Sequence, residues 1–166
     1  MPWDRSGDRF RIARCANMLH KLEERTEGKT TMSVESTRKV MRKYWDSAHS
    51  DVSMMADDVV FTIMATGEET QGPEAVLGLL NYFYHGAFDA RGDIRNEIIA
   101  AGKAMWEGYF VGRHIGEFAG IPATGKEVRV PLCVVYELED EQIKQARVYF
   151  EMPVLLQQLG VQMGAG

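Results

Sequence analysis

The chain has 166 residues, of which 45% are hydrophobic and 26% are charged, and its formal net charge is −5 at pH 7. This balance is typical of one soluble globular domain. The acidic charge argues against nucleic-acid binding, and no apolar run approaches the roughly 20 residues of a membrane-spanning helix. Charged residues interrupt the N-terminus, and Cys15 and Cys133 lie far apart. We therefore expect a cytoplasmic protein without a signal peptide or disulfide.

Residues 1–31 differ from the rest in composition. Apolar residues recur at helical spacing between Asp8 and Arg25, which predicts a short amphipathic helix. Residues 26–31, Thr-Glu-Gly-Lys-Thr-Thr, are typical of a linker. The pattern predicts a helical extension over 1–31 and a main domain over 32–166. The extension would be either an appendage or a helix that caps the domain or joins it to another copy.

The first half of the main domain mixes helical and strand patterns. A capping serine and an apolar stripe at steps of three and four predict a helix from about Ser33 to Ala48. Residues Asp51 to Asp57 predict a short second helix. The run from Val59 to Met64 predicts a strand. Gly72-Pro73-Glu74 is typical of a helix start, and that helix would end near Gly92.

The second half predicts strands. They would cover Ile94–Ala100, Ala104–Phe118, Glu127–Glu137 and Gln142–Met152, and a short helix would follow around Val154–Leu159. Helices followed by a run of antiparallel strands are typical of an α+β domain with helices packed on one side of a curved sheet.

Three stretches of the chain resemble the SnoaL-like polyketide cyclase family, within the superfamily of nuclear transport factor two and ketosteroid isomerase. They are His49-Ser50-Asp51 with residues 56–61, the glycine-rich stretch at 112–125, and Tyr149-Phe150-Glu151 with residues 155–160. The resemblance covers Val34 to Gly160. It implies a cone-like, curved mixed or antiparallel sheet wrapped by three or four helices, around a deep and mostly apolar pocket. It also implies an intramolecular aldol condensation that needs no cofactor and no metal.

Glu151 stands where the family has a catalytic Asp, counted back from Gln157-Gln158-Leu159-Gly160. The resemblance therefore implies that Glu151 is the general acid/base, in an apolar cavity that raises its pKa. The alternative is a strand-end carboxylate that is solvated or paired with Arg147, because alternation places Arg147, Tyr149 and Glu151 on one face.

His114 is the second candidate catalytic residue. Strand alternation groups it with aromatic side chains, so we expect it to be either pocket-lining, where it could assist proton transfer, or a satisfied core histidine. The first helix offers Tyr44, which could stabilise an enolate through a hydrogen bond or belong to the plain core. The candidate substrate-binding residues share an aromatic or hydrogen-bonding side chain: Tyr44, Trp45, Trp106, Phe110, Arg147 and Tyr149.

Missing residues argue against several related chemistries. Ketosteroid isomerases carry an Asp near the end of the first strand, and the comparable position here is about Ile63, between Thr62 and Met64. The four histidines lack metal-ligand spacing, and no phosphate or dinucleotide motif is present. We therefore expect neither a metal nor a cofactor.

Two hypotheses follow. The first is a cofactor-independent acid/base enzyme, of cyclase, aldol, lyase or isomerase type, acting on a hydrophobic carbonyl compound. The second is a non-catalytic binding or dimerisation module, because a fold does not determine a function. Whether Glu151 and His114 face one cavity separates the two. We also expect a homodimer through one face of the sheet, either the opposite face or the face that carries Arg129, Pro131, Cys133, Val135 and Glu137.

Overall fold

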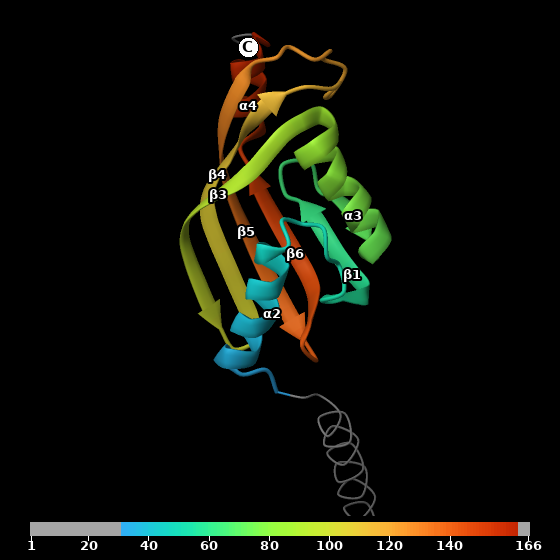
Figure 1. The fold of residues 1–166 in the computed structure, drawn as a ribbon, viewed down its shortest axis with the longest axis vertical. Coiled ribbons are helices and arrows are strands. Elements are labelled where there is room, and N and C mark those ends of the chain that lie inside the picture. The colour runs from blue at the N-terminus through green and yellow to red at the C-terminus, as the bar shows by residue number, and fades with distance from the viewer. Residues whose placement is uncertain (1–30, 163–166) are drawn as a thin grey trace, which may run out of the picture. The chain divides into compact units, whose positions relative to one another are not determined.

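The computed structural model describes residues 31–162, so the extension predicted over 1–31 lies outside the described residues except for Thr31. Within residues 31–162, three α-helices and one π-helix accompany a six-stranded sheet. The strands and helices form the predicted α+β domain, and the sheet is curved, mixed and open (Figure 1). Element labels follow Figure 1.

The sheet has the strand order β2-β1-β6-β5-β4-β3. The pairing of β1 with β6 is parallel and the other four pairings are antiparallel. The strands are β1 Met55–Ile63, β2 Glu68–Gln71, β3 Phe88–Ala100, β4 Lys103–His114, β5 Glu127–Glu139 and β6 Gln142–Phe150.

Helices cover the inner face of the sheet and its end. Helix α2, Val34–Asp46, begins at a capping box in which Ser33 and Ser36 satisfy each other's backbone N–H groups. Helix α3, Pro73–Asn81, continues into the π-helix η1, Tyr82–Ala87, and α4 is Met152–Leu159. In Figure 1, α2 crosses in front of β5 and β6 while α3 lies beside β1. Their apolar sides pack onto the inner face, which therefore contains the core.

The structure corrects the predicted second helix. Residues 51–54 form a turn, in which the Asp51 carboxylate accepts the Ser53 backbone N–H at 2.9 Å, and β1 begins at Met55. A local bond of this kind competes with helix formation. Strand β3 also begins at Phe88 rather than near Ile94, because pairing with β4 along its whole length overrides the low strand propensity of Asp89 and Gly92.

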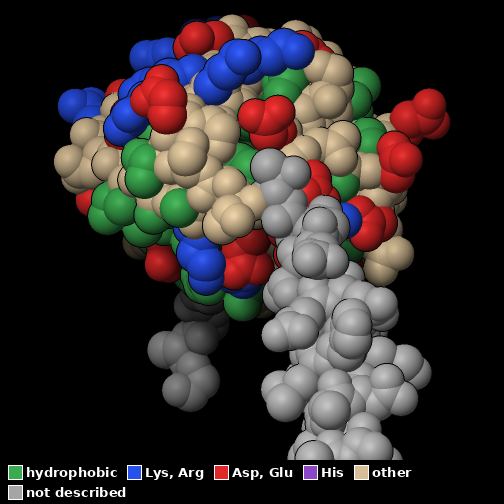
Figure 2. Space-filling view, turned by 90° about the horizontal axis from the view of Figure 1, so that it is seen from below, with side chains coloured by type: hydrophobic (Ala, Val, Ile, Leu, Met, Phe, Trp, Pro, Cys, Tyr) green, Lys and Arg blue, Asp and Glu red, His purple; other side chains and the backbone are tan. Residues whose placement is uncertain are grey.

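The outer face of the sheet is polar. The Arg129 guanidinium lies 3.8 Å from the centre of the Tyr109 ring and 3.1 Å from the Asp93 carboxylate, while Lys103 lies 3.3 Å from Glu137. At the end of the domain seen in Figure 2, basic and acidic side chains are interspersed. Among the described helices, none combines the length and the hydropathy that crossing a membrane requires.

Candidate functional site

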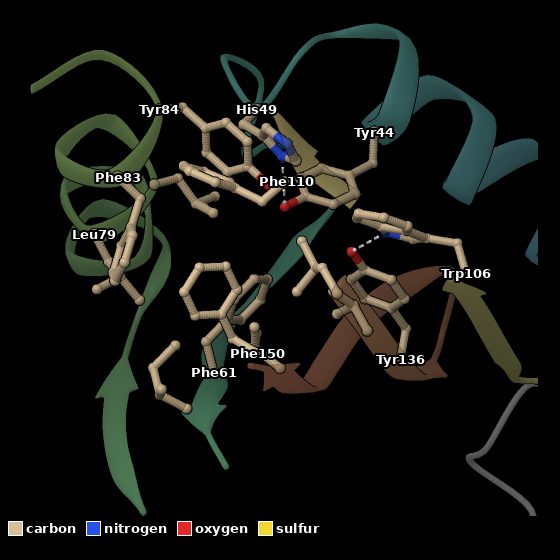
Figure 3. A pocket seen from close by; sticks show the side chains of 15 residues that line it. Tyr44, His49, Phe61, Leu79, Phe83, Tyr84, Trp106, Phe110, Tyr136 and Phe150 are labelled. Atoms are coloured by element: carbon tan, nitrogen blue, oxygen red, sulfur yellow. Dashed lines mark hydrogen bonds between the residues drawn. The ribbon is translucent and has the colours of Figure 1, made fainter. Parts of the chain in front are cut away.

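An aromatic pocket lies between the inner face of the sheet and the helices α2, α3 and η1 (Figure 3). Ten of its fifteen lining side chains are hydrocarbon, and the other five bring hydroxyl, imidazole or indole groups. The space left between them is about 50 Å³. That holds a few water molecules, whereas pockets for drug-sized ligands reach about 300 Å³ or more. The polar lining residues are Tyr44, His49, Tyr84, Trp106 and Tyr136.

His49 and Tyr44 form a hydrogen-bonded pair in this pocket. The His49 Nδ1 atom lies 3.3 Å from the Tyr44 hydroxyl oxygen, and Figure 3 shows the bond. His49 follows α2 in a turn in which both Ala48 and His49 have positive φ angles, 50° and 69°. Left-handed backbone at non-glycine residues is uncommon and costs free energy. The turn folds the imidazole back toward α2. There the ring also stacks on Tyr84 of η1, with 4.4 Å between the ring centroids.

The titratable groups of the pocket are uncharged at neutral pH. Burial, with a smaller contribution from the charge of His85, lowers the pKa of His49 to about 4. Burial also raises the pKa of Tyr44 and of Tyr84, and the neighbouring phenols add to this effect. The pocket therefore contains a neutral imidazole among neutral phenols.

Tyr136 lies on the other side of the pocket, on β5. Its hydroxyl oxygen accepts a hydrogen bond from Trp106 Nε1 on the adjacent strand β4, at 3.3 Å. The Trp45 indole lies edge-on to the Tyr136 ring, 6.3 Å between centroids. Trp45 itself lines a neighbouring hollow, whose wall it shares with His49, Tyr84 and Trp106. These last three side chains line both spaces and so separate them.

The structure places Glu151 outside the pocket, which corrects the expectation of a carboxylate in an apolar cavity. Glu151 is exposed, precedes α4, and lines a shallow hollow on the outer face together with Tyr149, which is 45% exposed. Arg147 lies 3.5 Å from Glu137, also on the outer face. The reason is strand alternation: Phe150 occupies the inner face and lines the pocket instead.

His114 is fully buried, but it lies outside the pocket. Its Nδ1 accepts the Thr124 backbone N–H at 3.2 Å and lies 3.0 Å from the Thr124 hydroxyl. Its ring packs 5.0 Å from Phe88, and its Nε2 is buried without a hydrogen-bond partner among the described residues. The bond to Thr124 ties down the loop between β4 and β5, so the structure brings His114 to the core and does not bring it together with Glu151.

Three of the predicted substrate-binding residues line the pocket, namely Tyr44, Trp106 and Phe110. Sequence reasoning missed other polar groups of the site. Tyr136 lies on the buried side of the alternating strand β5, and Tyr84 continues the apolar stripe of α3 into η1, so both had a periodic signal. His49 follows a helix end and had none. Among residues 31–162, no three His, Cys, Asp or Glu side chains are grouped so that they could hold a metal ion.

The fold matches solved structures of several proteins. A protein described as a SnoaL-like polyketide cyclase from Jannaschia sp. CCS1 superimposes with a TM-score of 0.69 at 14% identity, over 80% of this chain and 96% of that one. IdmH of Streptomyces antibioticus, described as a polyketide cyclase, gives 0.63 at 19% identity, over 75% and 99%. AclR of Streptomyces galilaeus, described as a hydroxylase, gives 0.66 at 18% identity, over 81% and 87%. These likenesses show a shared fold.

No curated protein matches the sequence at a significant level. A family profile, in contrast, matches residues 35–159, which is most of the chain and contains the whole aromatic pocket. The profile is described as SnoaL-like polyketide cyclase. This match agrees with the strand order, the helices on the inner face and the apolar pocket. The chain belongs to the SnoaL-like polyketide cyclase family.

Proposed function

We propose that the chain is a cofactor-independent enzyme that binds a hydrophobic carbonyl compound in the aromatic pocket and moves a proton with His49. One observation carries this proposal: a neutral imidazole, oriented by the hydroxyl of Tyr44 at 3.3 Å, lines a pocket with mostly hydrocarbon walls. Nδ1 is engaged by Tyr44, while Nε2 makes no hydrogen bond with any described residue. Nε2 is therefore left for a ligand.

The chemistry of this pair is general base catalysis. When Nδ1–H donates to the Tyr44 oxygen, the Nε2 lone pair accepts a proton from the carbon next to a carbonyl group. The electron pair of that C–H bond moves into the carbonyl group, which becomes an enolate. A base with a pKa of about 4 is weak, so the enolate must be stabilised by donors such as the pocket phenols. The enolate then takes a proton at another carbon or attacks a second carbonyl group.

The side chains that line the aromatic pocket indicate the class of substrate. Aromatic and aliphatic side chains favour a hydrophobic ring system, and the solved structures named as polyketide cyclases share this fold. Because the free space is about 50 Å³, a two-ring ligand must displace part of the lining. The stacked pair of His49 and Tyr84, which separates the pocket from the neighbouring hollow, is the part that we expect to move.

Deuterium exchange tests the proposal without knowledge of the natural substrate. The full chain is incubated with 2-tetralone in deuterated water, and loss of the α-proton signals is followed by NMR. We expect faster exchange with the wild type than with buffer, and a loss of about 100-fold or more in His49→Gln, the scale of a removed general base. The control is Gln145→Glu, at an exposed position of the central strand β6 that does not line the pocket. Wild-type exchange in His49→Gln contradicts the assignment.

A non-catalytic binding module is the second candidate. The position of Glu151 favours it, because the carboxylate that the family resemblance assigned to acid/base chemistry is exposed on the outer face. In this case 2-tetralone binds, as measured by titration calorimetry, but its exchange is no faster than in buffer.

We also propose that the outer face of the sheet forms a homodimer interface, since helices cover the inner face. Val135 lies there between Met105 and Arg147 on the neighbouring strands. Val135→Glu should convert a dimer into a monomer in light scattering, whereas Val34→Glu, an exposed position on α2, should not. A monomeric wild type, or a dimeric Val135→Glu, contradicts this interface.

A further inference from the structure

The hydroxyl of Tyr136 has a hydrogen that no described residue accepts. A phenol has one O–H donor and two acceptor lone pairs. Trp106 Nε1–H donates to the oxygen at 3.3 Å. The Trp45 indole N–H, in contrast, is buried without a hydrogen-bond partner among the described residues, and burial raises the pKa of Tyr136 to about 12. The Trp106 indole thus occupies one lone pair of the oxygen, and the O–H hydrogen remains without an acceptor among the described residues.

The position of this hydroxyl directs it to the pocket. Tyr136 is 2% exposed, and its ring is held by edge contacts with Tyr44 and Trp45, with centroids 6.0 and 6.3 Å apart. Figure 3 shows the hydroxyls of Tyr136 and Tyr44 both pointing toward the middle of the pocket residues. A buried donor without an acceptor is unfavourable, and hydrocarbon walls offer no acceptor. The missing acceptor must come from whatever occupies the pocket.

The other two phenols of the pocket are less suited to donate a hydrogen bond to a bound ligand. The Tyr44 hydroxyl is engaged with His49. The Tyr84 hydroxyl makes no hydrogen bond within residues 31–162, but its ring stacks on His49 and so moves with that residue. Tyr136, in contrast, lies on a central strand of the sheet and is oriented by Trp106. Hydrogen bonds that a hydroxyl accepts also strengthen the one it donates.

We infer that the Tyr136 hydroxyl is the donor that binds the carbonyl oxygen of the ligand, so that it makes the pocket prefer a carbonyl compound over a hydrocarbon of the same shape. The inference rests on the proposed function, because it takes the aromatic pocket as the ligand site. It adds the residue that sets specificity and that stabilises the enolate oxygen when His49 removes the proton. Tyr136 would then contact the reacting group and share in catalysis.

The test compares two probes of one ring frame, 2-tetralone and tetralin, which lacks the carbonyl group. Affinities are measured by titration calorimetry for the wild type, Tyr136→Phe, Tyr84→Phe and the control Tyr109→Phe, an outer-face tyrosine stacked with Arg129. We expect the wild type to prefer the ketone about tenfold, the scale of one hydrogen bond. Tyr136→Phe should lose this preference and keep its affinity for tetralin. Tyr84→Phe should still prefer the ketone, and the control Tyr109→Phe should keep both affinities.

The carbonyl stretch of bound 2-tetralone gives a second readout. It should lie at lower frequency in the wild type than in Tyr136→Phe, because a hydrogen bond weakens the C=O bond. A full ketone preference in Tyr136→Phe, or its loss in Tyr84→Phe alone, overturns the inference and leaves the pocket and His49 in place. A wild type that binds both probes equally also overturns it. A wild type that binds neither probe contradicts the proposed function itself.

Discussion

The hydroxyl oxygen of Tyr44 lies 3.3 Å from Nδ1 of His49, although the two residues belong to different local structures. Tyr44 is on the last turn of α2, and His49 is in the left-handed turn after it. The helix buries the phenol and the turn returns the imidazole to it. This arrangement fixes which ring nitrogen is engaged and leaves the other for a ligand, as a general base requires.

The pH profile of α-proton exchange should show the pKa of His49. Because burial lowers this pKa to about 4, the imidazole is unprotonated throughout the neutral range. We expect the exchange rate to be constant above about pH 5 and to fall as the pH drops through 4. The measurement is the NMR exchange of 2-tetralone over that range. A midpoint near 6.5, the ordinary value for histidine, would show that a different or a solvated imidazole is the base.

The same shift predicts how stability depends on pH. His49 has a lower pKa in the folded protein than the ordinary 6.5, so the unfolded chain binds a proton more readily. Above pH 6.5 the neutral burial of His49 contributes about 3 kcal/mol to the free energy of unfolding. This contribution is lost as the pH falls through 4. Urea unfolding between pH 7 and 4 should therefore show a smaller loss of stability in His49→Gln than in the wild type. Equal losses in the two proteins would rule out a buried neutral imidazole.

Glu151→Gln should change little. The carboxylate is exposed, and as the residue before α4 it makes no capping hydrogen bond through its side chain. We expect exchange of 2-tetralone within about twofold of the wild type and a free energy of unfolding within about 0.5 kcal/mol. NMR exchange and urea unfolding measure the two quantities. A 100-fold loss of exchange would return the acid/base role to Glu151, as the family resemblance implied.

The alternation of β5 was predictable because the pattern is local. Val128, Val130, Leu132 and Val134 are all buried on one side, as the sequence indicated. The same reasoning grouped Arg147, Tyr149 and Glu151 on one face but could not say which face was inside. Their apolar neighbours Val148 and Phe150, which line the pocket, indicate that the opposite face is the inner one. The family resemblance implied that Glu151 faces the inside, while the residues themselves left a solvated or paired carboxylate as the alternative.

The site around His49 could not be predicted from periodicity. Its groups come from α2, η1, β4 and β5, which meet only when the sheet and the helices pack. The short turn after α2 was expected to begin another helix at Asp51, which hid the return of the chain toward Tyr44. No pattern of spacing shows that a single histidine after a helix lies against two tyrosines. Only the tertiary structure brings them together.

Thr124→Val tests whether His114 is structural. The substitution keeps the shape of the side chain but removes the hydroxyl that lies 3.0 Å from His114 Nδ1 and 3.3 Å from the Lys126 backbone nitrogen, whose N–H it accepts. We expect a loss of about 1 kcal/mol in the free energy of unfolding and faster hydrogen exchange in residues 115–126. Affinity for 2-tetralone should be unchanged, because His114 lies outside the pocket. A tenfold loss of affinity would give His114 a functional role after all.

Two glycine-to-alanine substitutions should have opposite effects on stability. At Gly116, a Cβ atom would overlap the backbone carbonyl oxygen of Gly86, in the π-helix that carries Tyr84. The backbone of Gly116 also donates to Ala87 O at 3.0 Å, so relief of the overlap must move η1. We expect Gly116→Ala to lose about 1–3 kcal/mol of unfolding free energy and to weaken binding of 2-tetralone, because the stack of Tyr84 on His49 shifts.

Gly78→Ala is the control for Gly116→Ala. Gly78 is exposed in the interior of α3, and a Cβ atom there meets nothing within 4 Å. Alanine in a helix interior is favoured over glycine by about 1 kcal/mol, so stability should rise while affinity stays the same. Urea unfolding and titration calorimetry of both variants make the comparison. If Gly116→Ala lost stability but kept its full affinity, the position of η1 would not matter to the pocket, and Tyr84 would have no part in holding His49 in place.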